Sequence, residues 1–116
     1  MNLYDITDYK TAVNRGSMGS GHGWTVGWAV AWNCTAKSFV IQQPPGSVNW
    51  AIGCVGKLED RPQPFGKVGR DPNMPRGTID AHGAPVGPKS LYLAQLRERL
   101  GPKALEAIGY SEGDVK

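Results

Sequence analysis

The stretch that decides the predicted fold is WTVGWAVAWNC, residues Trp24 to Cys34. Tryptophan and valine occupy alternate positions along it, and small residues occupy most of the positions between them. The tryptophan spacing also fits a helix, so periodicity alone leaves the assignment open. The β-branched residues, Gly27 and the glycines just upstream favour a strand. Its two faces are apolar or small, which is typical of a strand buried on one side and packed closely on the other.

Shorter runs on either side have similar character. Ser38 to Gln42 is rich in strand-forming residues and ends at the turn Pro44-Pro45-Gly46, through which a strand cannot continue. Val48 to Val55 predicts a third strand, and Thr11 to Asn14 predicts a fourth. The sequence therefore indicates a mainly β protein.

A weak internal repeat relates two of these strands. AVAWNC, Ala29 to Cys34, aligns with NWAIGC, Asn49 to Cys54, at an offset of 20 residues. Such a period indicates a solenoid, in which equivalent strands stack about 4.8 Å apart and Cys34 would lie beside Cys54. Stacked coils need sharp corners, which agrees with 16 glycines in 116 residues and with the absence of Asn-Gly and Asp-Gly hairpin turns. We expect a β-solenoid.

The C-terminal half has a different composition. Residues 58–88 predict a long surface loop rich in proline and glycine, with one short strand near Gly77 to Asp80. Ser90 to Leu100 predicts a helix with Ser90 as its N-cap and Gly101 as its stop, and Pro102 to Ile108 predicts a second, short helix. We expect one domain, residues 1–116, with coils over 1–57, the loop over 58–88 and a helical cap over 89–110.

Composition excludes several classes of protein. The 16 glycines and 9 prolines exclude a helix bundle, and 40% hydrophobic residues exclude a disordered chain. The net charge of +3 comes from scattered basic residues, so no nucleic-acid partner is predicted, whereas an acidic polysaccharide would suit a mildly cationic surface. No apolar segment is long enough to span a membrane, and no signal peptide is evident.

The two cysteines, Cys34 and Cys54, form neither a disulfide framework nor a zinc-binding motif. Reduced thiols in the core are the favoured reading, although the sequence leaves their redox state open. No spacing of acidic residues or histidines indicates a metal site. We predict no metal and no cofactor.

Three blocks together resemble a known family. They are RGSMGSGHGWTVGWAVAWNC, QQPPGSVNWAIGCVG and GAPVGPKSLYLAQLRERLG, and the resemblance covers roughly Leu3 to Tyr110. They resemble the C-terminal coils of bacterial right-handed parallel β-helix proteins, the pectate-lyase-like secreted proteins that act on polysaccharides. The resemblance implies a short right-handed parallel β-helix with a C-terminal capping helix. It also implies an extracellular or periplasmic location and a glycan-binding or lyase-like role.

The resemblance directs attention to the block from Asn14 to Trp24. A β-helix lyase needs a cation that neutralises the uronate carboxylate and a base that removes a carbon-bound proton. Arg15 is the candidate cation and His22 the candidate base. Trp24, Trp50 and Asn14 are the candidate substrate-binding residues. The alternative, which the residues favour, is that the glycines form a tight corner in which His22 bonds to the backbone.

Two further alternatives remain open. The three tryptophans of Trp24 to Trp32 would fill the core or contact another chain, which leaves Trp50 as the tryptophan most free to lie at the surface. Proteins of the resembling kind are several times longer, so we expect a terminal piece that lacks its first coils. The alternative function is therefore a non-enzymatic assembly module. It would self-associate as a homo-oligomer, or dock on a partner chain that supplies the missing coils, through its open edge.

Overall fold

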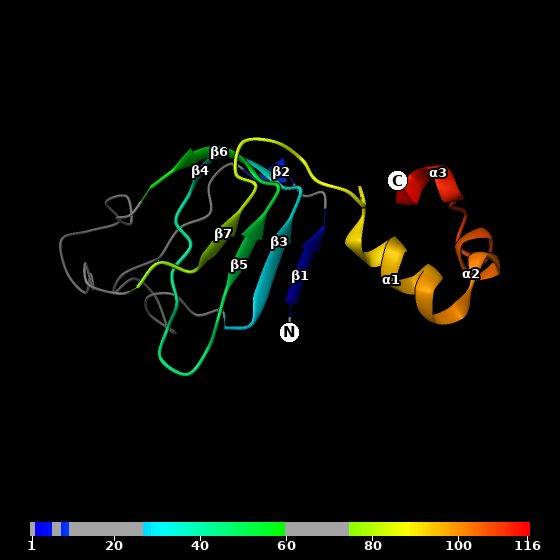
Figure 1. The fold of residues 1–116 in the computed structure, drawn as a ribbon, viewed down its shortest axis with the longest axis horizontal. Helices are drawn as coiled ribbons and strands as arrows, with labels where there is room; N and C mark the ends of the chain where they lie inside the picture. Colours follow the sequence, from blue (N-terminus) through cyan, green and yellow to red (C-terminus); the bar gives the residue numbers. More distant parts are fainter. Residues whose placement is uncertain (1, 6–7, 10–26, 60–74) are drawn as a thin grey trace.

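The computed structural model describes residues 2–5, 8–9, 27–59 and 75–116 (Figure 1). Its strands are β1 (Asn2–Asp5), β2 (Asp8–Tyr9), β3 (Ala29–Trp32), β4 (Thr35–Phe39), β5 (Trp50–Ile52), β6 (Val55–Leu58) and β7 (Thr78–Asp80). Its helices are α1 (Leu91–Leu100), α2 (Pro102–Ala107) and α3 (Glu112–Val115). None of these helices is long and apolar enough to cross a membrane. The strand predicted over Thr11 to Asn14 lies outside the described residues.

The strands form two parallel sheets. One sheet has the order β1-β3-β5-β7 and the other has the order β2-β4-β6, so successive strands alternate between the sheets. Val30 pairs with Trp50 and Ala31 with Ala51, which confirms the offset of 20 residues predicted from the internal repeat. Parallel pairing of strands that are not consecutive also explains why the chain has no hairpin turn between them.

The expected right-handed parallel β-helix, or β-solenoid, is wrong. A solenoid stacks coils of similar length, whereas the register here advances by unequal intervals. Asn2 pairs with Ala29, Val30 with Trp50, and Trp50 in turn with Thr78. The described strands are two short parallel sheets that face each other, and no regular coil repeat is detected in them.

The expected capping role of the C-terminal helices is also wrong. The helices lie to the side of β1 and extend away from both sheets (Figure 1). Their buried side chains form a cluster of their own, Leu93, Leu105 and Val115. This cluster is separate from the one between the sheets, because the three helices bury apolar surface chiefly against one another.

The core between the sheets is built largely from small residues. Its buried members are Ala31, Cys34, Ala36, Phe39, Ile41, Ala51 and Cys54. Small side chains allow the two sheets to approach closely, and Phe39 and Ile41 fill the remaining volume. The alanines of β3 and β5 point into this core, so the larger residues that alternate with them must point outward. Trp28 and Trp32 are therefore not part of the core expected of them, and Trp24 lies outside the described residues.

The strand boundaries differ from the predicted ones because of the corners. β3 ends at Trp32, and the predicted strand from Val48 to Val55 is divided into β5 and β6. The residues after β3, β5 and β7 are Asn33, Gly53 and Ala81, and all three have left-handed backbone, with φ of 49°, 66° and 47°. A left-handed residue turns the chain sharply, which ends each strand at the same level of the sheet.

The predicted helix over Ser90 to Leu100 is confirmed as α1. The Ser90 side chain accepts a hydrogen bond from the Leu93 N–H at 3.1 Å, and Gly101 ends the helix with a φ of 81°. A second acceptor comes from the other end of the sequence. Asp5 of β1 accepts hydrogen bonds from the Ser90 hydroxyl at 2.5 Å and from the Leu91 and Tyr92 N–H groups at 3.0 and 3.1 Å. The first strand thus caps the first helix.

Asn33 connects the sheet to the segment that leads into α1. Its side-chain oxygen accepts from the Val86 N–H at 2.8 Å, and its amide nitrogen donates to the Val86 and Lys89 carbonyls at 2.8 and 2.9 Å. The Trp32 indole N–H adds a bond of 2.8 Å to the Pro88 carbonyl. Asn33 combines two roles, because its backbone turns the chain and its amide holds residues 86–89 against the sheet.

We predict that Asn33→Asp destabilises the protein more than Asn33→Gly does. In Asn33→Asp one carboxylate oxygen keeps the bond from the Val86 N–H, but the other replaces the donating amide nitrogen and faces the Val86 and Lys89 carbonyl oxygens. Asn33→Gly loses the side-chain bonds but accepts the left-handed backbone. Urea unfolding followed by circular dichroism should show losses of about 2–4 kcal/mol for Asn33→Asp and a smaller loss for Asn33→Gly. Equal effects, or a loss below about 1 kcal/mol for both variants, would contradict this role.

Candidate functional site

The outward face of the four-stranded sheet presents two rows of side chains. One row is Leu3, Val30, Trp50 and Thr78, and the other is Asp5, Trp32, Ile52 and Asp80. Residues 86–89 lie over part of the second row, as the bond from Trp32 to Pro88 shows. The first row contains only uncharged side chains and includes Trp50, which is partly buried. It is the more open part of this face.

Trp28 stands beside this first row. Its ring centroid lies 6.1 Å from that of Trp50, with the two ring planes inclined by 45°. Trp28 is 48% exposed and precedes the first residue of β3. The two indoles together form an aromatic surface, which we call the Trp28–Trp50 pair.

The backbone of Trp28 is strained. Its φ is 59°, in the left-handed region, where a bulky residue is a genuine outlier. The next peptide is held in place, because the Ala29 N–H donates at 2.9 Å to the buried side-chain oxygen of Asn49. Strained residues of this kind cluster at functional sites, where the surrounding structure enforces a conformation that the residue alone would avoid.

The structure brings together only part of the predicted site. Trp50 lies on the outward face but is partly buried, and Trp28, not Trp50, is the exposed tryptophan among the described residues. Asn14, Arg15, His22 and Trp24 lie outside the described residues. Sequence reasoning missed Trp28, because it was grouped with the other tryptophans of one predicted strand. The signal that sets it apart is its position just before β3, where the backbone leaves the strand conformation.

The two cysteines are structural rather than reactive. Cys34 and Cys54 are free thiols, fully buried, at the corners that follow β3 and β5. The hydrogen bond with the Cys34 side chain and burial together raise the pKa of Cys54 well above its ordinary value. A thiol in this state stays protonated and is a poor nucleophile and metal ligand.

No other chemistry is gathered in the part of the chain that the structure describes. His82 lies in the loop after β7, with its Nε2 2.6 Å from the Gly56 carbonyl oxygen. Across residues 2–5, 8–9, 27–59 and 75–116, no group of three or more His, Cys, Asp or Glu side chains is placed to hold a metal ion. The Trp28–Trp50 pair is therefore the strongest candidate for recognition on the sheet.

Comparison with known proteins adds nothing to this geometry: no protein-family model, curated protein or solved structure matches the chain.

We predict that the free energy of unfolding falls as the pH rises above about 9. The unfolded Cys54 thiol ionises near 9.0, whereas the folded one holds its proton to higher pH, so alkaline conditions favour the unfolded state. Urea unfolding at several alkaline pH values measures the slope, to which one such group contributes at most about 1.4 kcal/mol per pH unit. Cys54→Ala should flatten the slope, and an unchanged slope would contradict the assignment.

Proposed function

We propose that the protein binds a glycan through the Trp28–Trp50 pair. The observation that carries the proposal is Trp28 itself, a half-exposed indole held in a strained backbone conformation next to a second indole. A sugar ring presents an apolar face of C–H groups that stacks on an indole. An exposed aromatic surface stabilises the complex with such a ligand. Without a ligand, the same surface lowers the solubility of the protein, so its presence indicates a binding site.

The inclination of the two rings suits a ring-shaped ligand. At 6.1 Å between centroids and 45° between planes, the indoles form an open angle rather than a parallel stack. One sugar unit can rest on either ring while its hydroxyl groups remain in water. Val30 and Thr78 extend the same row on either side of Trp50 without adding charge. The pair therefore recognises shape more than charge.

The charge of the glycan is a separate part of the proposal. The net charge of +3 supports an acidic polysaccharide, such as a polyuronate, because a cationic surface attracts a polyanion over distance. A lyase-like reaction would depend on Arg15 and His22. Since these residues lie outside the described chain, we limit the proposal to binding.

The first prediction from this proposal separates binding from stability at Trp28. Trp28→Gly and Trp28→Ala both remove the indole, but only glycine relieves the strain of a φ of 59°. We expect both variants to lose glycan binding at least about tenfold, while Trp28→Gly is more stable than Trp28→Ala by about 1 kcal/mol. Affinity electrophoresis in polygalacturonate and in neutral glucan gels measures binding, and thermal unfolding measures stability.

The matched controls are Trp50→Ala and Leu100→Ala. Trp50→Ala removes the second indole and should reduce binding, whereas Leu100 is 69% exposed on α1 and its loss should leave binding unchanged. Full binding by folded Trp28→Gly in both gels would show that the pair does not bind glycans. Retention by polygalacturonate alone would support the acidic ligand.

Assembly is a second candidate function, favoured by the edges of the four-stranded sheet. Among the described residues, β1 and β7 each have one strand neighbour, β3 and β5 respectively. An edge strand offers backbone N–H and C=O groups that can pair with a second copy of the chain. The alternative to pairing is hydration of those groups.

We predict a concentration-dependent dimer in light scattering at micromolar protein. The Thr78 N–H donates to the Asn49 carbonyl within the fold, so the variant that tests the edge must keep this backbone N–H. Thr78→Lys keeps that N–H, places a charge on an exposed position of the edge strand, and should reduce association if β7 is the contact. A monodisperse monomer at all concentrations would contradict assembly and leave the glycan proposal unaffected.

A further inference from the structure

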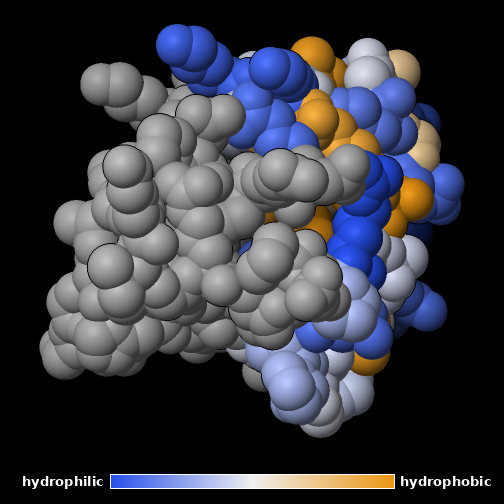
Figure 2. Space-filling model, turned by 90° about the vertical axis from the view of Figure 1, so that its left-hand side faces the viewer, coloured by the Kyte–Doolittle hydropathy of each residue, from blue (hydrophilic) through white to orange (hydrophobic). Residues whose placement is uncertain are grey.

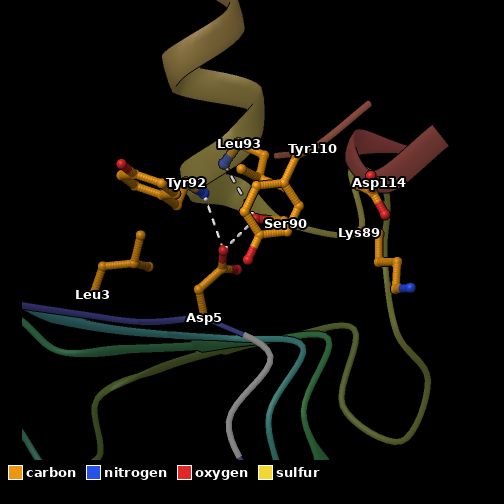
Figure 3. Close-up of a pocket in the computed structure, with 8 residues that line it drawn as sticks. All are labelled: Leu3, Asp5, Lys89, Ser90, Tyr92, Leu93, Tyr110 and Asp114. Carbon is orange, nitrogen blue, oxygen red and sulfur yellow. Dashed lines mark hydrogen bonds between the residues drawn. The ribbon is translucent and has the colours of Figure 1, made fainter. Parts of the chain in front are cut away.

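A cavity lies at the junction between β1 and the C-terminal helices (Figure 3). Its volume is about 630 Å³, within the range of small-molecule sites, and such sites are frequent where two structural units meet. The side chains that line it come from β1, from the segment before α1, from the first turn of α1, from the residues before α3 and from α3 itself: Leu3, Asp5, Lys89, Ser90, Tyr92, Leu93, Tyr110 and Asp114. This cavity is distinct from the Trp28–Trp50 pair.

The cavity has a polar base that is already satisfied. Asp5 accepts from the Ser90 hydroxyl and from the Leu91 and Tyr92 N–H groups. Ser90 in turn accepts from the Leu93 N–H. These groups give the cavity a fixed shape. A ligand would therefore meet the remaining lining residues, chiefly the tyrosines on one side and Lys89 with Asp114 on the other.

The two tyrosines are the accessible part of the lining. Tyr92 is 49% exposed and Tyr110 is 48% exposed. Figure 3 shows Tyr92 above Leu3 and Tyr110 between Tyr92 and Lys89. Each side chain offers an aromatic ring together with a hydroxyl that both donates and accepts hydrogen bonds.

Two of the charged side chains in the lining, Lys89 and Asp114, have opposite signs. Asp114 accepts from the Ser111 N–H at 2.8 Å and from its hydroxyl at 3.0 Å, and these bonds hold the pKa of its carboxyl below the ordinary value. It therefore carries a negative charge at neutral pH, opposite to the positive charge of Lys89. Two neighbouring hydroxyl groups of a ligand would fit between them, because one can accept a hydrogen bond from the Lys89 ammonium group and the other can donate to the Asp114 carboxylate.

We propose that this cavity is a second saccharide-binding site, which takes a neutral sugar unit. The sugar ring packs against Tyr92 and Leu3, and its hydroxyl groups bond with Lys89, Asp114 and the tyrosine hydroxyls. A polyanion fits less well, because the lining holds two carboxylates, Asp5 and Asp114, against one ammonium group. This inference rests on the proposed function only for the idea that the ligand is a glycan.

The sheet places the two sites within reach of one chain. Leu3, which lines the cavity, is in register with Val30, and Val30 is in register with Trp50. Since adjacent strands lie about 4.8 Å apart, Leu3 and Trp50 are separated by about 10 Å across the outward face. A glycan of several units that spans both sites binds more tightly than a short one, because the second contact becomes intramolecular.

The test measures the affinity of neutral gluco-oligosaccharides of increasing length by calorimetry. We expect the wild-type protein to bind the hexasaccharide at least about tenfold more tightly than the disaccharide. The double variant Tyr92→Ala/Tyr110→Ala should lose this gain with length. Lys89→Ala is a second and milder variant, because it keeps the backbone bond from the Lys89 N–H to the Val115 carbonyl. It should lose part of the gain in affinity with oligosaccharide length. Leu100→Ala, on the same helix as Tyr92, is the matched control.

The outcomes separate the two proposals. If Trp28→Gly abolishes binding but the tyrosine and Lys89 variants bind every length as the wild type does, the cavity inference is overturned and the proposed function stands. If the tyrosine variant loses binding and Trp28→Gly does not, the cavity is the site and the Trp28–Trp50 proposal fails. If no gluco-oligosaccharide binds the wild-type protein, the cavity inference is overturned. Polygalacturonate binding in the gel assay then decides the proposed function alone.

Discussion

The rest of the structure depends on the hydrogen bonds between the side-chain amide of Asn33 and the backbone of residues 86–89. The left-handed backbone of Asn33 ends β3, and the Asn33 side chain holds residues 86–89 through the Val86 and Lys89 backbone groups. That attachment determines where Ser90 lies, and Ser90 begins α1. A residue without a side-chain amide could turn the chain at this corner, as Gly53 does in the next one, but it would leave the helices without this anchor.

A second link, made by Asp5, turns that anchor into a junction with a defined shape. Because Asp5 bonds to the N-terminal groups of α1, the first strand and the first helix hold each other in place from opposite ends of the sequence. The cavity lies directly above this link (Figure 3). At the other end of the molecule, Figure 2 shows apolar and hydrophilic described residues interleaved rather than gathered in one large patch.

Local signals were sufficient to predict some elements but not their assembly. The helix from Ser90, the short strand near Asp80 and the offset that pairs Val30 with Trp50 all follow from caps, turns and repeated residues. The inward face of β3 does not follow from such signals. The large tryptophan side chains predict that they fill the core, whereas two closely spaced sheets leave room only for small side chains such as alanine. The anchor at Asn33 joins groups more than fifty positions apart, so no local pattern reveals it.

The central claim, that the outward sheet face binds a glycan through Trp28 and Trp50, is tested most directly by nuclear magnetic resonance of the three described indole N–H groups. Titration with a polygalacturonate oligomer and with a gluco-oligosaccharide should shift the Trp28 and Trp50 signals saturably. The Trp32 signal should remain in place, because its N–H is bonded to the Pro88 carbonyl. If the Trp28 and Trp50 signals stay fixed at saturating concentrations of both ligands, the account of this face is wrong.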